Sequence, residues 1–278
     1  MLRFPLLLPC QTCYACLLYL TCLPAHGDPV LQPSSTTVQA PLDLLPLKKA
    51  LAPLSGAAPL QSHTTIRMTG TQAGVSVMLR EDIQLVCRYP NRFRAMLTQY
   101  DSSGGPQKKL VVVSNGTLVW TYRPGLAEYS VTSLAAWKKA DNDIPTLGLV
   151  MGGFYLGSGR PLVQGVHSIT PANSAQVQAV LQQMEISLSR QVKSAGGQDD
   201  YVYSLTLAKQ DLAYQFYVGS QTNALTRVDL AGTQNNIQFS YREDVTRIAP
   251  YPAVSASIFV FVPPPGTIKT AAVSVNPL

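Results

Sequence analysis

Apolar and polar residues alternate along much of this chain, which is the pattern of β-strands that bury one face and expose the other. The clearest run covers residues 75–89, whose alternate apolar positions are Val75, Val77, Leu79, Ile83, Leu85, Cys87 and Tyr89. Glu81 interrupts this apolar face, and we expect it to mark a bend. Cys87 shares the face, so it is predicted to be a buried small hydrophobic residue rather than a reactive thiol.

A β-hairpin is predicted further along the chain, at Asn115-Gly116. Residues 92–100, 109–114 and 117–123 have the composition and alternation of strands. Asn and Gly adopt the positive φ angles that a tight hairpin turn requires. Asn115 also begins an N-glycosylation acceptor triplet, Asn-Gly-Thr, but the flanking strands already account for it as a turn.

The last third of the chain is predicted to be an antiparallel meander. Five segments, each with a shared apolar face, are separated by short turn-like stretches. Large aromatic side chains on such faces either pack a core or line a ligand cavity. The members of these faces are Tyr201, Tyr203, Leu205 and Leu207; Leu212, Tyr214, Phe216 and Val218; Thr226, Val228 and Leu230; Ile237, Phe239 and Tyr241; and Ile258, Val260 and Val262.

Helical patterns are fewer and shorter than the strand patterns. Residues 42–55 suit a short helix, which Pro46 and Pro53 are expected to divide into pieces. Residues 132–140 and 173–184 are further helix candidates. Residues 145–156 form an uncharged, glycine-containing apolar stretch, which is either a buried helix or a mobile flap over a cavity.

The first 27 residues have the pattern of a secretory signal peptide, which predicts a periplasmic or otherwise exported protein. Arg3 precedes an uncharged apolar stretch, and Ala25 and Gly27 place small residues before a cut at Asp28. Two alternatives are an uncleaved membrane anchor and lipidation at Cys22. Residues 28–41 are rich in Pro, Ser and Thr and are predicted to be a flexible lead-in.

Composition and charge narrow the class of partner. The formal net charge is +6, but the basic residues are scattered, whereas nucleic-acid binding requires a clustered basic face. After the signal, no stretch of 18 apolar residues exists to span a membrane.

Removal of the signal leaves Cys87 as the one thiol, so no internal disulfide is expected. The cysteine run at 10–16 lies in the apolar part of the signal without charged or His partners, so we predict no metal there.

Catalytic motifs are absent from the sequence. It contains neither G-x-S-x-G nor H-E-x-x-H, and the two imidazoles after the signal are His63 and His167. The acidic pairs Asp199-Asp200 and Glu243-Asp244 consist of neighbours, which point to opposite faces of a strand. We therefore predict a non-enzymatic binding protein without a cofactor or metal. A site with either His beside a carboxylate is the enzymatic alternative.

Residues 93–131, FRAMLTQYDSSGGPQKKLVVVSNGTLVWTYRPGLAEYSV, resemble the LolA/LolB/RseB-like superfamily, and most closely its predicted periplasmic LolA-like proteins. That superfamily includes lipoprotein carriers, lipoprotein receptors and a sensor that regulates an anti-sigma factor. The resemblance implies a mainly β (α+β) fold: a curved antiparallel sheet, or open half-barrel, with helices covering its mouth. Residues 42–278 would then form a single LolA-like domain.

The resemblance also implies a function, which is to bind a lipid or a lipoprotein acyl chain in the concave face of the half-barrel. Candidates for the cavity wall are Leu118, Trp120, Tyr122, Tyr214, Phe216 and Phe239. Candidates for the lid are Leu147, Leu149, Met151 and Phe154. Candidates for an arginine that holds the lid closed are Arg92 and Arg94. The alternative is an envelope sensor or assembly module that binds another protein through the same fold.

Overall fold

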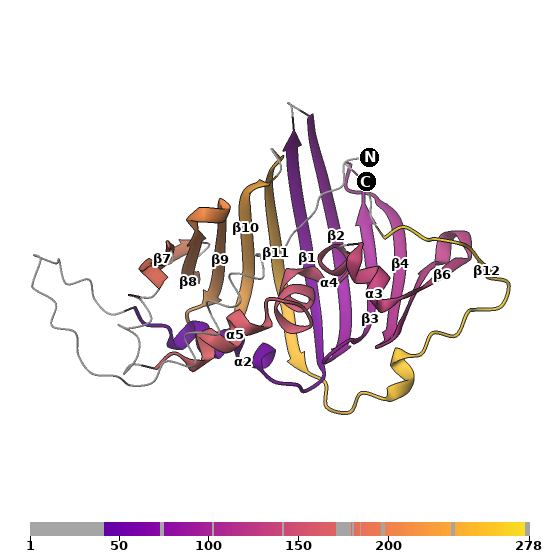
Figure 1. The fold of residues 1–278 in the computed structure, drawn as a ribbon, viewed down its shortest axis with the longest axis horizontal. Coiled ribbons are helices and arrows are strands. Elements are labelled where there is room, and N and C mark those ends of the chain that lie inside the picture. The colour runs from indigo at the N-terminus through magenta and orange to yellow at the C-terminus, as the bar shows by residue number, and fades with distance from the viewer. Residues whose placement is uncertain are drawn as a thin grey trace, which may run out of the picture.

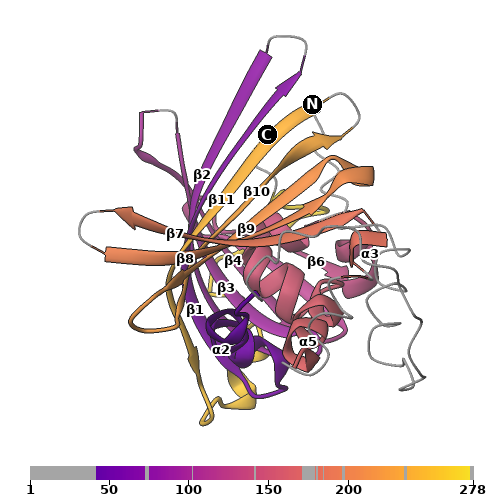
Figure 2. The same ribbon diagram turned by 90° about the vertical axis from the view of Figure 1, so that its left-hand side faces the viewer.

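One curved, open sheet of twelve strands dominates this computed structural model (Figures 1 and 2). The structure describes residues 42–275, except 73–74, 102, 141, 171–178, 180, 184, 196–197 and 235–236. The predicted signal peptide, the lead-in 28–41 and most of the predicted helix 173–184 lie outside the described residues. The sheet runs β12-β6-β5-β4-β3-β2-β1-β11-β10-β9-β8-β7, which confirms the predicted class of a curved, predominantly antiparallel sheet with helices.

Two meanders make up this sheet. The first contains β1 (Leu60–Gln72), β2 (Val75–Arg88), β3 (Arg92–Tyr100), β4 (Pro106–Asn115), β5 (Leu118–Arg123) and β6 (Glu128–Ser133). The second contains β7 (Ile186–Ala195), β8 (Gln198–Leu207), β9 (Leu212–Gly219), β10 (Leu225–Gln234) and β11 (Ile237–Pro250). The two are joined where β1 pairs antiparallel with β11, from Leu60 opposite Pro250 to Thr71 opposite Gln238. The short β12 (Ile268–Lys269) adds to the edge of β6 in parallel.

The helices lie on one face of the sheet, in front of it in Figure 1 and on its concave side in Figure 2. We name this the inner face and the opposite one the outer face. The helices are α2 (Leu45–Ser55), α3 (Leu134–Lys139), α4 (Asp143–Gly148), the π-helix η2 (Leu149–Tyr155) and α5 (Arg160–Ser168). Short 3-10 turns are η1 (Pro124–Leu126), η3 (Ala208–Gln210) and η4 (Ala256–Phe259). None of the helices described is long and apolar enough to cross a membrane.

The helix at 45–55 is continuous rather than divided by its two prolines. Pro46 lies in the first turn, where a missing N–H breaks no intrahelical hydrogen bond. Pro53 lies in the last turn, where it removes one backbone hydrogen bond, the one to the carbonyl of Lys49, without ending the helix. The prediction of separate pieces was therefore wrong.

The alternation predicted for β2 is confirmed, but the bend at Glu81 is not. Leu79, Ile83, Leu85 and Cys87 are buried on the inner face, and Cys87 is fully buried. Glu81 is also fully buried on that face, and the register of β2 with both neighbours runs through it without a shift. A hydrogen-bonding partner on β3 makes this burial tolerable, and a single sequence does not reveal such a partner.

The hairpin at Asn115-Gly116 is confirmed. Gly116 has a φ of 99°, which favours glycine, and it lies between β4 and β5. The Asn115 side-chain oxygen accepts hydrogen bonds from the backbone N–H groups of Thr117 and Leu118, both at 2.9 Å. This side chain therefore closes the turn, as Asn commonly does.

The C-terminal segment differs from its prediction. Instead of a strand at 258–262, the chain forms η4 and then runs without sheet pairing until β12. Phe261 packs on the outer face between the rings of Tyr122 and Tyr129, with centroids 5.7 Å from each. Alternating apolar residues here cover a sheet face rather than join the sheet, and period-two patterning does not distinguish these outcomes.

Candidate apolar binding site

An apolar cavity of about 50 Å³ lies between the helices α2 and α5 and the inner face of β7–β9. Its lining side chains are almost all aliphatic or aromatic, and residues of η2 also contribute. Representative members are Leu51, Phe154, Val166, Leu188, Leu205 and Phe216. Sites that bury small molecules usually measure roughly 300–1,000 Å³. The structure therefore shows a closed arrangement, with too little space for a ligand of that size.

An aromatic cluster forms one wall of this cavity. Phe154 of η2 lies 5.6 Å from the ring of Phe216 and 6.4 Å from that of Tyr214 on β9, measured between centroids. Tyr214 and Phe216 stack with an interplanar angle of 12°. Both follow the period of two along β9, so they share its inner face.

The start of α2 is attached to the edge of the sheet. Arg190 of β7 contacts a carboxylate oxygen of Asp43 at 2.9 Å, just before the helix. The Tyr203 hydroxyl of β8 donates to the backbone carbonyl of Asp43 at 3.0 Å. The helix that covers the cavity is thus held at its first turn by two strands that line it.

The end of α2 is attached to α5 by Arg160. This guanidinium donates to the backbone carbonyls of Ser55 at 3.1 Å, Gly56 at 2.7 Å and Tyr155 at 3.2 Å. It also lies 4.0 Å from the ring centroid of Tyr89. A cation near the last carbonyls of a helix is favourable because those groups lack intrahelical partners. Arg160 therefore connects α2, η2 and α5, the helices that close the cavity.

Glu243 of β11 attaches η2 to the sheet. This carboxyl group is fully buried, and its Oε2 accepts from the Val150 N–H at 3.0 Å and from the Tyr241 hydroxyl at 2.9 Å. The Leu149 N–H donates to the same hydroxyl at 2.9 Å. Burial raises the pKa of Glu243 to about 7, although these hydrogen bonds act in the opposite direction. The backbone N–H groups of Leu149 and Val150, at the start of η2, thus find their hydrogen-bond acceptors on β11.

Gly148 makes this close approach possible. Its φ of 76° and ψ of 164° belong to a backbone region that is essentially restricted to glycine. A Cβ atom here would lie 2.4 Å from Oε1 of Glu243. The junction between α4 and η2 therefore requires glycine for both conformation and space.

A second buried carboxyl group, Glu81, lies on β2. The side-chain amide of Gln99 donates to its Oε1 at 2.5 Å and to the carbonyl of Val275 at 3.0 Å. Burial raises the pKa of Glu81 to about 8, although the bond from Gln99 and the charge of Lys108 lower it. At neutral pH this group is mostly protonated, so it does not place a full charge inside the fold.

The predicted wall residues are divided between the two faces of the sheet. Phe216 lines the cavity and Tyr214 stacks on it, whereas Phe239 packs against the core without reaching the cavity. The other three, Leu118, Trp120 and Tyr122, alternate with the buried Val119 and Thr121 and therefore lie on the outer face. The structure thus places them away from the cavity.

The predicted lid residues form the buried segment α4–η2. Leu147, Leu149, Met151 and Phe154 are all at most 2% exposed. Of the two alternatives for residues 145–156, the structure shows the buried helical segment. Phe154 is the one lid candidate that also lines the cavity. The helices that lie directly over the cavity are α2 and α5.

The predicted arginine positions do not touch these helices. Arg92 is exposed at the start of β3, and Arg94 lies on the outer face of that strand. Arg160 is the arginine that contacts these helices, and it is not among the candidates predicted from the sequence. A signal existed, because proline directly after Arg160 is typical of a helix start.

Groups with catalytic or metal-binding chemistry are not gathered at the cavity. His63 lies on the outer side of β1, and His167 is exposed on α5. Burial raises the pKa of the Cys87 thiol, which fits a packed rather than a reactive group. Within the described ranges, no three His, Cys, Asp or Glu residues are placed to hold a metal ion.

No protein-family model and no curated protein matches the chain. Among solved structures, LprF from Mycobacterium bovis is 12% identical, with a TM-score of 0.39 and coverage of 76% of this chain and 97% of LprF. A putative outer membrane lipoprotein-sorting protein domain from Vibrio parahaemolyticus is 10% identical, with a TM-score of 0.30 and coverage of 78% and 95%. A chain of the MucA/MucB complex from Pseudomonas aeruginosa is 12% identical, with a TM-score of 0.33 and coverage of 79% of this chain and 60% of that chain.

With these sequence identities and with TM-scores below 0.5, the matches carry no argument about the family or the function of this protein. We therefore base the function of this protein on its own geometry.

Proposed function

We propose that this is an exported, non-enzymatic protein that binds an apolar ligand, a lipid or a lipoprotein acyl chain, on the concave side of its half-barrel. The observation that carries the proposal is the apolar cavity between α2, α5 and β7–β9. A cavity lined by aliphatic and aromatic side chains offers an acyl chain an environment free of unpaired polar groups. Binding would be driven by the removal of apolar surface from water, at about 25 cal/mol per Å².

Opening of the helices is the step that admits the ligand. The sheet is a continuous hydrogen-bonded structure, whereas α2 and α5 are held by apolar packing and by the polar contacts of Arg160 and Arg190. Separation of the helices breaks these contacts and exposes apolar side chains, which a bound acyl chain would cover again, but it leaves the hydrogen bonds of the sheet intact. A ligand that binds the open form shifts the population toward it.

Filling the cavity tests the proposal. Val166 of α5 lines the cavity, and Gln164 on the same helix is exposed. We expect Val166→Trp to weaken binding of 11-(dansylamino)undecanoic acid by about tenfold or more, because the indole occupies the chain's space. Gln164→Trp, the matched control, should bind the probe as the wild type does. Fluorescence titration measures both affinities, and equal affinities would place the binding site elsewhere.

The alternative function is an envelope sensor or assembly module that binds another protein. It is favoured by a second, larger groove on the outer face of the sheet. Native mass spectrometry of the protein from its own cell envelope separates the two functions. A co-purified lipid or acylated protein supports the carrier or receptor, and a stable protein complex without lipid supports the module.

A further inference from the structure

A groove of about 520 Å³ crosses the outer face of the sheet, opposite the helices. Its floor spans the adjacent strands β11, β1, β2 and β3, and Ile258 of η4 contributes to one side. Its lining mixes polar and basic side chains with apolar ones, whereas the inner cavity is lined almost entirely by apolar side chains. The polar and basic members include Gln61, His63, Gln84, Arg94 and Arg247, and the apolar members include Met96.

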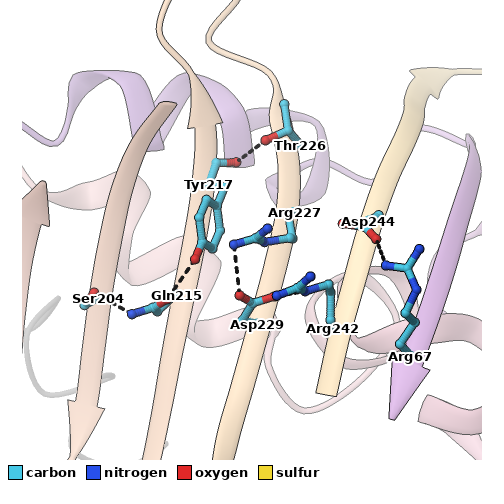
Figure 3. Close-up of polar contacts among 9 residues, drawn as sticks. All are labelled: Arg67, Ser204, Gln215, Tyr217, Thr226, Arg227, Asp229, Arg242 and Asp244. Carbon is cyan, nitrogen blue, oxygen red and sulfur yellow. Dashed lines mark hydrogen bonds and ion pairs between the residues drawn. The ribbon is translucent and has the colours of Figure 1, made fainter. Parts of the chain in front are cut away.

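The arginines of this groove lack acidic partners, although their neighbours have them. On the same outer face, Arg67 contacts Asp244 at 2.7 Å, and Asp229 contacts both Arg227 at 3.2 Å and Arg242 at 3.3 Å (Figure 3). Among the described residues, neither Arg94 nor Arg247 forms an ion pair or a side-chain hydrogen bond. Two arginines without an acidic partner therefore face this groove, and both can pair with an acidic group from another molecule.

A further acidic group on the outer face, Asp82, is already engaged. Asp82 of β2 accepts hydrogen bonds from the Thr65 hydroxyl at 2.7 Å and from the Tyr100 hydroxyl at 2.5 Å. Arg94 is half-buried, so leaving its guanidinium without an acceptor carries a cost in solvation. A ligand that supplies carboxylates would remove this cost, since guanidinium binds carboxylates in a bidentate geometry.

We propose that this groove binds an acidic segment of a partner polypeptide, with Arg94 and Arg247 each contacting a carboxylate. The strands that carry the two arginines are separated by β1 and β2. Neighbouring strands lie about 4.8 Å apart, so the two arginine positions are roughly 14 Å apart across the sheet. The register places Arg94 in line with Ala249, two residues from Arg247, so the full separation is roughly 16 Å. An extended peptide advances about 3.4 Å per residue, so acidic residues four to five positions apart reach both arginines.

The other side chains of the groove fit a peptide better than a lipid headgroup. Gln61 and Gln84 offer amide donors and acceptors to a peptide backbone. The apolar part of the groove is limited to Leu85, Val86, Met96 and Ile258, which suits one apolar side chain rather than an acyl chain. A lipid held in the inner cavity lies across the sheet and does not present its headgroup here. This inference stands apart from the proposed lipid binding.

Fluorescence anisotropy with two labelled heptapeptides tests the groove. One peptide is Gly-Glu-Ser-Val-Ser-Glu-Gly, and the other carries Gln in place of both Glu. We expect the protein to bind the Glu peptide about tenfold or more tightly than the Gln peptide. The Arg94→Gln/Arg247→Gln variant should lose this preference. The matched control, Arg88→Gln/Arg92→Gln, removes two exposed arginines of β2 and β3 outside the groove and should retain it.

Three results would overturn the proposal. They are equal affinity for the two peptides, equal loss of binding in the two double variants, and binding of phosphatidylglycerol vesicles, instead of peptide, that depends on Arg94 and Arg247. A thermal melt establishes that each variant is folded. Because Arg247 is exposed, Arg247→Gln alone provides a second variant with little effect on the fold, and it should weaken the Glu peptide by at least about threefold.

Discussion

At the scale of single residues, the buried carboxyl groups of Glu81 and Glu243 make the stability of the fold depend on pH. Among the described residues, Glu243 forms no ion pair, and its Oε2 accepts hydrogen bonds from the start of η2 and from Tyr241. Its raised pKa means that the folded state prefers the protonated form, whereas an unfolded chain ionises near the ordinary value of 4.5. Lower pH therefore favours the folded state.

Glu243→Gln should remove a defined part of the pH dependence of stability. In the wild type, this group's contribution is fully present below pH 4.5 and is lost as the pH rises to about 7. The wild-type free energy of unfolding should thus fall by on the order of 3 kcal/mol relative to the variant across this window. Urea unfolding of both proteins between pH 4 and 8 measures the difference.

Glu81 provides the internal comparison for that experiment. Its pKa of about 8 makes it lose its own contribution over a wider window, from 4.5 to about 8. Both proteins retain Glu81, so its effect cancels in the difference between them. Parallel pH profiles for the wild type and Glu243→Gln would show that Glu243 is ionised in the folded state.

Residue patterns predicted shared faces correctly but did not always say which face is inner. Leu118, Trp120 and Tyr122 do share a face of β5, and it is the outer one. Large apolar side chains occur there because Phe261 of the C-terminal segment covers Tyr122. The identity of a buried face depends on what covers it, and the covering segment is remote in sequence.

At the scale of elements, the pair of helices α2 and α5 decides access to the cavity. Arg160→Met should weaken their connection, because it removes three charge-assisted hydrogen bonds to backbone carbonyls while it keeps an apolar side chain. We expect the free energy of closure to fall by on the order of 1–3 kcal/mol. Stopped-flow fluorescence should then show faster uptake of the dansylated fatty acid.

Arg92→Met is the matched control for that measurement. It removes the same charge from a position that sequence reasoning favoured for holding the lid, but where the structure shows an exposed side chain outside the helical layer. Its uptake rate should equal that of the wild type. A faster rate for Arg92→Met with an unchanged rate for Arg160→Met would reverse the assignment.

The strands could be predicted because each has a regular alternation of its own, as β2 and β9 show. The segment 143–155 was harder, since nearly all its residues are apolar and no period emerges. The structure divides it at Gly148, whose backbone conformation ends α4 and starts η2. Position 148 requires glycine because Glu243, on a strand distant in sequence, leaves no room for a Cβ atom. Only the folded structure reveals this requirement.

At the scale of the whole molecule, the C-terminal segment ties one side of the sheet together. After β12, Val273 and Val275 return to the hydrophobic core, and the Val273 N–H donates to the Ser130 hydroxyl at 3.0 Å. The carbonyls of Ser274 and Val275 accept bonds from Lys108 and Gln99. The segment therefore bridges β3, β4 and β6 across the inner side.

Shortening these two valines should loosen that side of the molecule. Val273→Ala/Val275→Ala removes buried methyl groups, which costs about 2 kcal/mol at each position. We expect a lower melting temperature and faster hydrogen exchange in β6 and β12. Ala272→Ser changes an exposed neighbour and should leave both unchanged. Wild-type exchange in the double variant would mean that the segment does not stabilise this edge.

The joint between β1 and β11 has a consequence for the order of folding. Each meander pairs strands that follow one another in sequence, so its contacts are local. The joint instead pairs Leu60 with Pro250, residues near opposite ends of the described chain. Contacts between such distant residues form late, because a long loop must close first. The sheet therefore becomes continuous only when nearly the whole described chain is available, so a polypeptide truncated before β11 leaves the edge of β1 unpaired.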